Sequence, residues 1–369
     1  MRVAIVHDWL TTVGGAEKVI LELKKIFPEA PIYTLVYNEK KLGAYFDKCK
    51  IKTSYLQKNP LAKKKHQLFF KYMPRAFEEF DLSEFDLIIS SSSAFAKGVI
   101  TSPNSIHVCY CHTPPRYIWD LTHEYLKDYN FLVRKYLEKK FHYLRMWDSI
   151  AANRVDYFIA NSFYVAKRIK KFYKRESRVI YPPVDTEYFT PSKDGKIEDY
   201  YLIVSRLVAY KRVDLAIEAF NQLSKRLIIV GDGPEFKKLK GLAKNNIEFL
   251  GYQSDEVIKE LYQHCKALIF AGVEDFGIVP VEVQACGRPV IAYKMGGATE
   301  TVEENKTGIF FERQNVESLR NAVIKFETNI QNFDSRYIRL HAEKFSAQRF
   351  REEFERFILE VINEKGFGK

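Results

Sequence analysis

Short apolar runs alternate with longer amphipathic stretches along almost the whole chain, and this alternation constrains the fold more than any other feature. In the first half the apolar runs are RVAIV, PIYTLVY, DLIIS, IHVCYC and DYFIA, separated by stretches such as AEKVILELKKIF. The short runs are typical of buried strands, and the longer stretches have the 3.6-residue period of helices. One helix between successive strands predicts parallel sheets with helices on both faces.

The second half repeats this scheme with the runs YYLIVS, RLIIVG, IEFLG, ALIFAG, PVIAY and TGIFF. A polar, proline-bearing stretch over residues 181–199 lies between the two series and reads as a linker. At 369 residues the chain is long enough for two cores. We therefore predict two doubly wound, Rossmann-like α/β domains facing a cleft, residues 1–185 and 186–345. An amphipathic helix over 346–369 is expected to cross back to the first domain.

The N-terminus and the cysteines bear on the cellular compartment. The start MRVAIVHDWL runs directly into a strand pattern, and no apolar stretch is long enough to span a membrane. The sequence therefore predicts a cytoplasmic protein without a signal peptide or a transmembrane helix. The five cysteines are odd in number and scattered, which favours small buried side chains over disulfides or a zinc site.

Two glutamates stand eight positions apart in EDFGIVPVEVQACGRPVI. In one continuous helix they would lie about 12 Å apart, too far for the carboxyl pair of a glycosidase, which needs roughly 5 to 9.5 Å. Gly277 favours a turn and Pro280 the first position of a helix, so we expect Glu274 in a loop and Glu282 in the first helical turn. Such a helix N-terminus can hold an anion while the carboxylates accept from hydroxyls. A sugar nucleotide fits this description.

Two cations follow the first strand of the second half, in SRLVAYKRVD. Arg206 and Lys211 would stand at the carboxyl edge of the sheet, where open α/β sheets bind ligands. Arginine binds phosphate in a bidentate manner and lysine as a point charge, so the pair could clamp a diphosphate. The chain has neither a P-loop nor an Asp-x-Asp pair, and we expect no metal site. A solvated basic helix start is the alternative, and charge alone does not separate Lys211 from Arg212.

Glycine loops recur at predicted strand ends. VGDGPE carries Gly231, Asp232 and Gly233, which either form a tight turn or approach a nucleotide. VGGAEK opens a helix with Gly14 and Gly15, whose amides could approach a phosphate or a sugar, although a GxGxxG dinucleotide pattern is absent. KMGGATETV is a third such loop.

One histidine stands at a predicted strand end. His112, in CYCHTPPRYIWD, would lie at the expected cleft. A lone histidine is more often structural, so both readings stay open.

The net charge of +11 suggests an anionic partner. Residues 51–75 contain seven Lys or Arg and no acid, interleaved with Tyr and Phe. This mixture suits single-stranded nucleic acid, an anionic membrane surface, or simply a solvated face. We favour peripheral contact with an anionic membrane, on the inner face of the cytoplasmic membrane, and expect no nucleic acid partner.

The motifs as a set resemble a known family. The run SRL…KRVD…GDGPE…EDFGIVPVE…GRPVIAYKMGGATETV…TG resembles the retaining GT-B glycosyltransferases of family 4 over nearly the whole chain. The segments HDWLTTVGGAEK, CHTPPRYIWD, ANSFYVAKRIKKFY and YPPVD are most similar to the branch containing mannosyltransferases of O-antigen and related polysaccharide assembly.

The resemblance implies a role for each candidate residue. Arg206 and Lys211 would bind the donor diphosphate, and Glu282 the ribose hydroxyls. Glu274 would contact the hydroxyls of the transferred sugar. The remaining implied contacts are amides near Phe276, Gly277 and Ile278 at the donor, Gly14 and Gly15 by the donor phosphate or the acceptor, and His112 by the sugar.

The resemblance also implies a reaction. A hexose, mannose from GDP-mannose by branch resemblance or a sugar from a UDP-linked donor, would pass to a glycan or polyprenyl-linked acceptor without a cofactor or metal. The reaction would be a same-face displacement in which the departing diphosphate helps to deprotonate the acceptor. A sugar-nucleotide epimerase or hydrolase could use the same residues, and a non-enzymatic nucleic-acid binder would account for the charge but not for the carboxylates and glycine loops.

Overall fold

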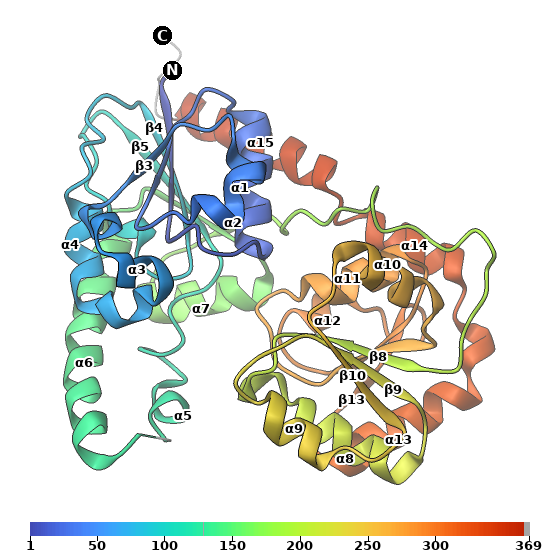
Figure 1. The fold of residues 1–369 in the computed structure, drawn as a ribbon. Coiled ribbons are helices and arrows are strands. Elements are labelled where there is room, and N and C mark those ends of the chain that lie inside the picture. Colours follow the sequence, from blue (N-terminus) through green and yellow to red (C-terminus); the bar gives the residue numbers. More distant parts are fainter. Residues whose placement is uncertain (128, 365–369) are drawn as a thin grey trace. The chain divides into compact units, whose positions relative to one another are not determined.

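The computed structural model describes residues 1–127 and 129–364 and divides into two compact units (Figure 1). The N-terminal unit comprises residues 1–181 together with 351–364, and the C-terminal unit is Pro182–Phe350. Each unit contains one parallel sheet with helices packed on it. The α/β class and the Rossmann-like repeat expected from the alternating pattern are confirmed.

The N-terminal unit has a seven-stranded sheet in the order β3-β2-β1-β4-β5-β6-β7. Five of its strands coincide with the predicted apolar runs. The sequence analysis missed the two edge strands, which are short and not apolar throughout. The strands are β1 (Val3–His7), β2 (Ile32–Thr34), β3 (Ile51–Thr53), β4 (Leu87–Ser92), β5 (Ile106–Cys111), β6 (Tyr157–Ala160) and β7 (Arg178–Val179).

Polar side chains cap several helices of this unit. Asn130 accepts a hydrogen bond from the Val133 amide at the start of α6, and Ser162 does the same for Val165 at the start of α7. The helices are α1 (Gly15–Ile26), α2 (Glu39–Phe46), η1 (Tyr55–Lys58), α3 (Pro60–Lys64), η2 (His66–Tyr72), α4 (Met73–Glu78), η3 (Ala96–Gly98), α5 (Thr122–Leu126), α6 (Phe131–Asn153) and α7 (Phe163–Tyr173).

The C-terminal unit has a six-stranded sheet in the order β10-β9-β8-β11-β12-β13. This is the 3-2-1-4-5-6 order of a doubly wound fold, built from the six predicted strands. They are β8 (Tyr201–Val204), β9 (Leu227–Val230), β10 (Ile247–Gly251), β11 (Ala267–Phe270), β12 (Val290–Tyr293) and β13 (Gly308–Phe311). The helices are η4 (Ala209–Lys211), α8 (Val213–Leu223), α9 (Phe236–Leu242), α10 (Asp255–His264), α11 (Ile278–Ala285), α12 (Ala298–Thr301), α13 (Val316–Thr328), η5 (Ile330–Asn332) and α14 (Ser335–Glu343).

The last helix, α15 (Ala347–Glu364), begins in the C-terminal unit, and from Arg351 onward it belongs to the N-terminal unit. There Arg351 forms an ion pair with Glu22 of α1, and the Tyr157 hydroxyl lies 3.2 Å from Oε2 of Glu364. Phe354 of α15 is fully buried. The final helix therefore packs on the N-terminal sheet through both apolar and charged contacts.

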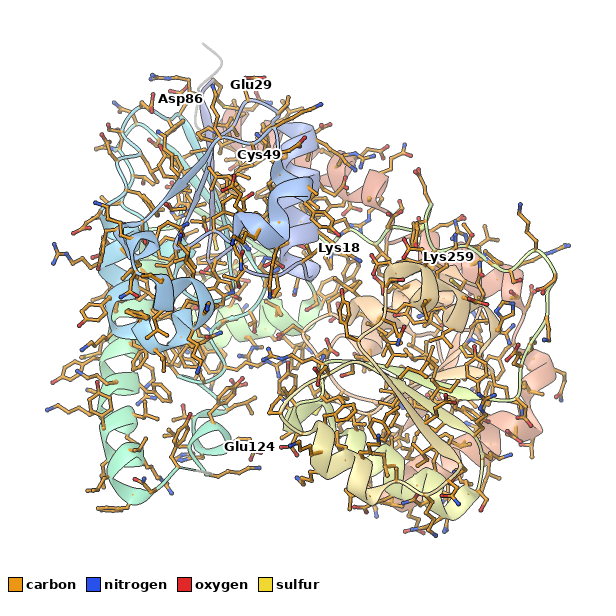
Figure 2. All side chains as sticks on the ribbon, viewed as in Figure 1. Lys18, Glu29, Cys49, Asp86, Glu124 and Lys259 are labelled. Atoms are coloured by element: carbon orange, nitrogen blue, oxygen red, sulfur yellow. The ribbon has the colours of Figure 1, made fainter. Side chains whose placement is uncertain are left out.

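Side chains fill both units (Figure 2), and each sheet has its own apolar core. The N-terminal core also holds a charged pair, Lys97 with Asp148, in which both side chains are 1 % exposed. Trp119 donates to the second carboxylate oxygen of Asp148 at 2.8 Å, so this buried charge is hydrogen-bonded as well as paired. All five cysteines are free, and all but the half-buried Cys49 are buried. Within the described residues no helix combines the length and apolarity needed to cross a membrane.

The strand order of each sheet reverses once. In the N-terminal unit the chain leaves β1 toward β2 on one side and returns to β4 on the other, and in the C-terminal unit the same reversal separates β8 from β11. Loops that leave the carboxyl ends of such neighbouring strands diverge, and open α/β sheets bind ligands there. The reversal points therefore define where a site is expected in each unit.

Candidate functional site

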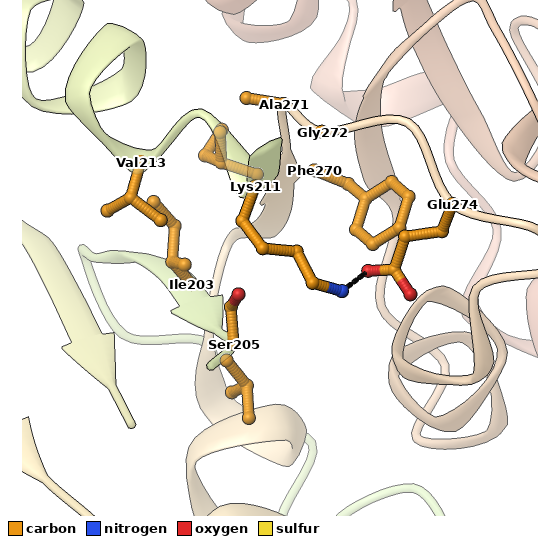
Figure 3. A pocket seen from close by; sticks show the side chains of 10 residues that line it. Ile203, Ser205, Lys211, Val213, Phe270, Ala271, Gly272 and Glu274 are labelled. Carbon is orange, nitrogen blue, oxygen red and sulfur yellow. Dashed lines mark hydrogen bonds and ion pairs between the residues drawn. The ribbon is translucent and has the colours of Figure 1, made fainter. Parts of the chain in front are cut away.

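Lys211 and Glu274 meet at the reversal point of the C-terminal sheet. Lys211 ends the short helix η4 after β8, and Glu274 lies in the loop after β11. Their side chains form an ion pair and are 15 % and 25 % exposed (Figure 3). The pair lies at the edge of a small pocket that is also lined by Ser205, Phe270 and other residues of the two strand ends. Two residues predicted separately are thus direct neighbours.

Gly272 allows this approach. A Cβ atom built on Gly272 would lie 2.9 Å from Cα of Lys211 and 3.0 Å from the carbonyl oxygen of Tyr210, which is closer than side chains normally come. The backbone after β11 can therefore touch the backbone of η4 only because residue 272 lacks a side chain. The sequence analysis did not single out Gly272, although a glycine directly after a strand in ALIFAG was a usable signal.

The three cations Arg206, Lys211 and Arg212 have different partners in the structure. Arg212 is bound elsewhere, because its Nε lies 3.2 Å from Oδ1 of Asp214 and its Nη1 lies 3.3 Å from Oε1 of Gln314. Arg206 is exposed and has no ion pair or side-chain hydrogen bond among the described residues. Arg206 is therefore open to an external anion, Lys211 is held by Glu274, and Arg212 is engaged in fixing the start of α8.

Helix α11 begins at Ile278, two residues earlier than predicted. Its N-cap, Gly277, has φ of +87°, a left-handed conformation that glycine adopts readily, and Pro280 occupies the third helical position. The expectation that Pro280 opens the helix is therefore wrong. Glu282 lies in the second turn, not the first, where it is 6 % exposed. The phenol of the fully buried Tyr262 donates to its Oε2 at 3.2 Å.

The first amides of α11 are open. Neither Gly277 nor Ile278 has an acceptor for its backbone N–H among the described residues. The first turn of a helix has unsatisfied N–H groups and carries a partial positive charge, so this end can receive an anion. Phe276 contributes differently: its side chain is buried and its ring centroid lies 5.7 Å from that of Phe345.

Gly231 and Gly233, in the loop after β9, allow this loop to pack closely on the loop after β8. Cβ atoms on Gly231 and Gly233 would lie 1.9 Å from the carbonyl oxygen of Ser205 and 2.2 Å from that of Leu207. In addition, the Leu207 amide donates to the Asp232 carbonyl oxygen at 2.9 Å. Gly231 and Gly233 thus support the segment that carries Arg206, and the exposed Asp232 uses its carboxylate to accept from the amide of Gly233 at 2.7 Å.

The third glycine loop, which carries Gly296 and Gly297, packs closely against the backbone of Glu274. The Gly297 amide donates to the carbonyl oxygen of Glu274 at 2.9 Å. A Cβ atom on Gly296 would lie 2.4 Å from that same oxygen. The loops after β8, β9, β11 and β12 are therefore one packed assembly around Lys211 and Glu274.

A second cluster lies at the reversal point of the N-terminal sheet. Nε2 of His112 lies 2.7 Å from Oγ of Ser91, and the same hydroxyl lies 3.2 Å from Nδ1 of His7. Nε2 of His7 lies 3.6 Å from Oε1 of Glu17, whose other oxygen accepts from the Gly14 amide at 2.8 Å. A continuous chain of polar contacts thus joins Gly14 to His112.

This chain defines the chemical state of the two predicted residues. Burial, helped by the neighbouring His7, lowers the pKa of His112 to about 4, so the imidazole is neutral at neutral pH. The Gly14 amide donates to the Glu17 carboxylate, which is the glutamate half of a capping box, whereas Gly15 begins α1 and has no acceptor for its amide among the described residues. Of the two predicted glycines, Gly15 is the one with an amide open to a ligand.

Asp8 organises the adjoining loop. Its two carboxylate oxygens accept hydrogen bonds from the amides of Ser93, Ala94, Phe95 and Ala96 at 2.6–2.9 Å. The sequence analysis did not identify Asp8, Glu17, Ser91 or Tyr262, all of which hold a predicted residue or its loop. The polar residues that end β1 and β4 were the available signal for Asp8 and Ser91, and an acidic residue in the first turn of α1 was the signal for Glu17. The sequence offered none for Tyr262.

Residues 51–75 are more structured than a solvated loop. They begin as β3 and continue through η1, α3 and η2, and Phe69 and Phe70 pack against the core. Tyr55, Leu61, Leu68 and Tyr72 are instead 40 %, 48 %, 61 % and 45 % exposed. Lys63, Lys64 and Lys65 are exposed beside them.

Family models match both halves of the chain. Residues 13–188 match the model described as Glycosyltransferase Family 4, and residues 185–339 match the model described as Glycosyl transferases group 1. The two matches meet close to the boundary between the two structural units. Both units therefore carry sequence similar to glycosyltransferases.

Curated relatives share part of the sequence. An uncharacterised glycosyltransferase of Methanocaldococcus jannaschii is 30 % identical over 190 residues, which is 50 % of this chain and 53 % of the relative. A GDP-mannose-dependent alpha-(1-6)-phosphatidylinositol monomannoside mannosyltransferase of Mycolicibacterium smegmatis is 34 % identical over 173 residues, 38 % of this chain and 44 % of the relative. The chain thus spans about half the length of the curated relatives it matches.

Solved structures match along the whole chain. The Anabaena protein HepE in complex with UDP gives a TM-score of 0.73 at 20 % identity, covering 98 % of this chain and 100 % of HepE. A sucrose-phosphate synthase from Thermosynechococcus elongatus also gives 0.73, at 15 % identity, covering 99 % and 100 %. The chain has the α/β fold of these GT-B proteins, and each of its halves matches a glycosyltransferase family model.

Proposed function

We propose that the protein transfers a hexose from a nucleoside diphosphate sugar to a hydroxyl group of a glycan or polyprenyl-linked glycan, without a metal ion and with retention of configuration. The observation that carries this proposal is the arrangement at the reversal point of the C-terminal sheet. Arg206 is an open cation, Lys211 is a second cation, and the unsatisfied amides at Gly277 and Ile278 begin α11. Together they supply the positive charge that a leaving diphosphate requires.

The carboxylates would bind the two ends of the donor. Glu282 is buried and oriented by Tyr262, which suits an acceptor for ribose hydroxyls. Glu274 is partly exposed at the pocket edge, which suits the hydroxyls of the transferred sugar. In the N-terminal unit, neutral His112 and the open amide of Gly15 are the groups proposed to contact the sugar and the acceptor.

The chemical step would proceed on one face of the sugar. The bond between the anomeric carbon and the diphosphate oxygen breaks, and the electron pair leaves with the diphosphate. The acceptor oxygen bonds to the anomeric carbon on the same face, and its proton passes to the departing phosphate oxygen. The main contribution of the protein is electrostatic stabilisation of the leaving group by Arg206 and Lys211.

GDP-mannose is the proposed donor, supported by the GDP-mannose-dependent relative and by the branch resemblance of the N-terminal motifs. A UDP-linked sugar is the alternative. The test is to incubate the protein with each nucleotide sugar, with and without polyprenyl-linked glycans and with EDTA, and to analyse the products. Acceptor-dependent release of nucleoside diphosphate that persists in EDTA is expected. Free or isomerised sugar formed without acceptor would instead establish a hydrolase or an epimerase.

We further propose that the N-terminal unit contacts an anionic membrane through residues 51–75 on the cytoplasmic side. Lys63, Lys64 and Lys65 supply charge, and exposed Leu68 and Tyr72 supply apolar and aromatic contact. Helix α6 also exposes apolar side chains, because its first residues Phe131 and Leu132 are 70 % and 77 % exposed. The rings of Phe70 and Phe141 lie 6.4 Å apart and connect the segment to α6.

Vesicle flotation tests this contact. Binding to phosphatidylglycerol vesicles but not to phosphatidylcholine vesicles is expected, and it should be lost when Lys63, Lys64 and Lys65 are all changed to Glu. A matched control changes Lys237, Lys238 and Lys240 of α9 to Glu, which alters the net charge equally in the other unit. Stronger, steeply salt-dependent binding to a random oligonucleotide would favour the nucleic-acid reading instead.

A further inference from the structure

The ion pair between Lys211 and Glu274 occupies the position proposed for the donor. Both residues were assigned to the donor, one to its diphosphate and one to its sugar, yet here each is the partner of the other (Figure 3). The pocket at whose edge they lie has a volume of about 10 Å³, which is no more than a single water molecule requires. Neither a sugar ring nor a phosphate group fits within this pocket, so for Lys211 to bind the diphosphate and Glu274 the sugar, the two side chains must exchange their mutual contact for contacts with the ligand.

The backbone around the pocket is held in place by packing and hydrogen bonds. The backbone of Lys211 is in contact with Gly272, and the backbone of Glu274 is held by Gly297. Lys211 and Glu274 can therefore separate only by rotation of their side chains, which are long and partly exposed. Separation leaves a cation and a carboxylate that each need a new partner, because an unpaired charged group in a partly buried site is costly.

An intact nucleotide sugar supplies both partners. Its diphosphate can bind Lys211, and the hydroxyls of its transferable sugar can donate to Glu274. Neither charged side chain is then left without a partner. The nucleoside diphosphate product supplies only one partner, since it can bind Lys211 but has lost the transferred sugar whose hydroxyls would donate to Glu274. Glu274 is then an unpartnered carboxylate beside the anionic diphosphate.

We propose that the Lys211–Glu274 pair distinguishes the nucleotide sugar from the spent nucleoside diphosphate and promotes product release. This inference rests on the proposed function of the same site. While the sugar is present, Glu274 is satisfied and Lys211 stabilises the diphosphate. Once the sugar has been transferred, Glu274 competes with the diphosphate for Lys211, and re-formation of the ion pair displaces the product.

Binding affinities of the variant Glu274→Gln test the proposal. Its neutral amide still contacts sugar hydroxyls but does not compete as a charge for Lys211. Calorimetry with GDP and GDP-mannose, and with the UDP pair if those bind, should show the diphosphate binding about tenfold tighter to Glu274→Gln than to the unaltered protein, a change of about 1.4 kcal/mol. The affinity for the nucleotide sugar should be unchanged or weaker, and product inhibition in the transfer assay should become stronger.

Two controls separate pairing from a general change in charge. Glu235→Gln removes a carboxylate of the same unit that pairs with Lys238 at 2.8 Å, and it should leave both affinities unchanged. In a protein that already carries Lys211→Ala, adding Glu274→Gln should no longer tighten the diphosphate, because the competition needs both partners.

The outcomes are distinct. Equal diphosphate affinity in Glu274→Gln and the unaltered protein, with both still binding the nucleotide sugar, would overturn the release proposal and leave the proposed function intact. Tightening that persists in the Lys211→Ala background would also overturn it, because simple charge repulsion would then be the cause. Absence of any nucleotide binding in the unaltered protein would overturn both proposals together.

Discussion

Ser91 contacts two histidines at once: its hydroxyl oxygen lies 2.7 Å from Nε2 of His112 and 3.2 Å from Nδ1 of His7. Ser91 stands on β4 where the strand order of the N-terminal sheet reverses. Through it, the end of β5 that carries His112 is connected to the end of β1. The orientation of His112, the residue proposed to meet the sugar, therefore depends on a neighbouring strand.

Ser91→Ala is expected to lower the turnover number of sugar transfer about fivefold, because losing the hydrogen bond to His112, worth about 1 kcal/mol, frees the imidazole to rotate. Steady-state kinetics and thermal unfolding would be measured together. Ser90→Ala is the matched control: Ser90 is the adjacent residue, and its hydroxyl lies 2.8 Å from Nε2 of the fully buried His107. Because successive strand residues point to opposite faces, this variant should lose stability but keep its turnover number. Equal turnover in the two variants would contradict a positioning role for Ser91.

Tyr262→Phe is expected to weaken nucleoside diphosphate binding about threefold to tenfold, a change of about 1 kcal/mol, because the buried phenol orients Glu282. Calorimetric titration of the variant measures the effect directly. Tyr201→Phe provides the comparison, since Tyr201 is another buried tyrosine of the same unit and donates to Glu327 at 2.6 Å, away from α11. If Tyr262→Phe binds like the unaltered protein, Glu282 does not depend on Tyr262 for its orientation.

His66→Phe should stabilise the protein and reduce its sensitivity to acid. His66 is 5 % exposed, packs against Trp9 with ring centroids 4.4 Å apart, and has no hydrogen-bond partner for either ring nitrogen among the described residues. Burial lowers its pKa from 6.5 to about 4. Between pH 6.5 and pH 4 the unfolded chain binds a proton at His66 that the folded chain does not bind. The free energy of unfolding is therefore highest above pH 6.5 and falls as the pH decreases toward 4.

Urea unfolding at pH 7 and pH 5 checks this prediction. The loss of free energy of unfolding between the two pH values should be smaller in His66→Phe by on the order of 1 to 2 kcal/mol. His142→Phe, a change at an exposed histidine of α6, should keep the original pH dependence. A pH dependence that is the same in all three proteins would exclude His66 as an acid-sensitive group.

The sequence predicts the fold well because both halves alternate strongly in hydrophobicity. All the strongly apolar strands were predicted. The missed edge strands β3 and β7 have two or three residues and mixed polarity, so they form mainly because a neighbouring strand is available. The start of α11 was misplaced for a local reason: Pro280 is a good first helical residue, but Gly277 adopts the left-handed cap two residues before the predicted position.

The candidate site was predictable as a set of residues but not as a set of contacts. Arg206, Lys211, Glu274 and Glu282 follow from motif and position, whereas the partner of each charge is decided by packing. Arg212 is adjacent to Lys211 in sequence yet points to Asp214, and Lys211 reaches Glu274 because Gly272 brings two backbones together. Such choices depend on contacts between residues far apart in the chain, and local sequence does not encode them.

The central claim is that the C-terminal unit binds a nucleotide sugar through Arg206 and Lys211. The most direct measurement is a thermal-shift panel of GDP, UDP, ADP and their sugar conjugates, with EDTA and then with magnesium. The unaltered protein, Arg206→Ala, and the control Arg212→Ala are compared. We predict that GDP and GDP-mannose stabilise the unaltered protein and Arg212→Ala in EDTA, and that Arg206→Ala loses most of this stabilisation. Equal stabilisation of all three proteins, or none by any nucleotide, would contradict the claim.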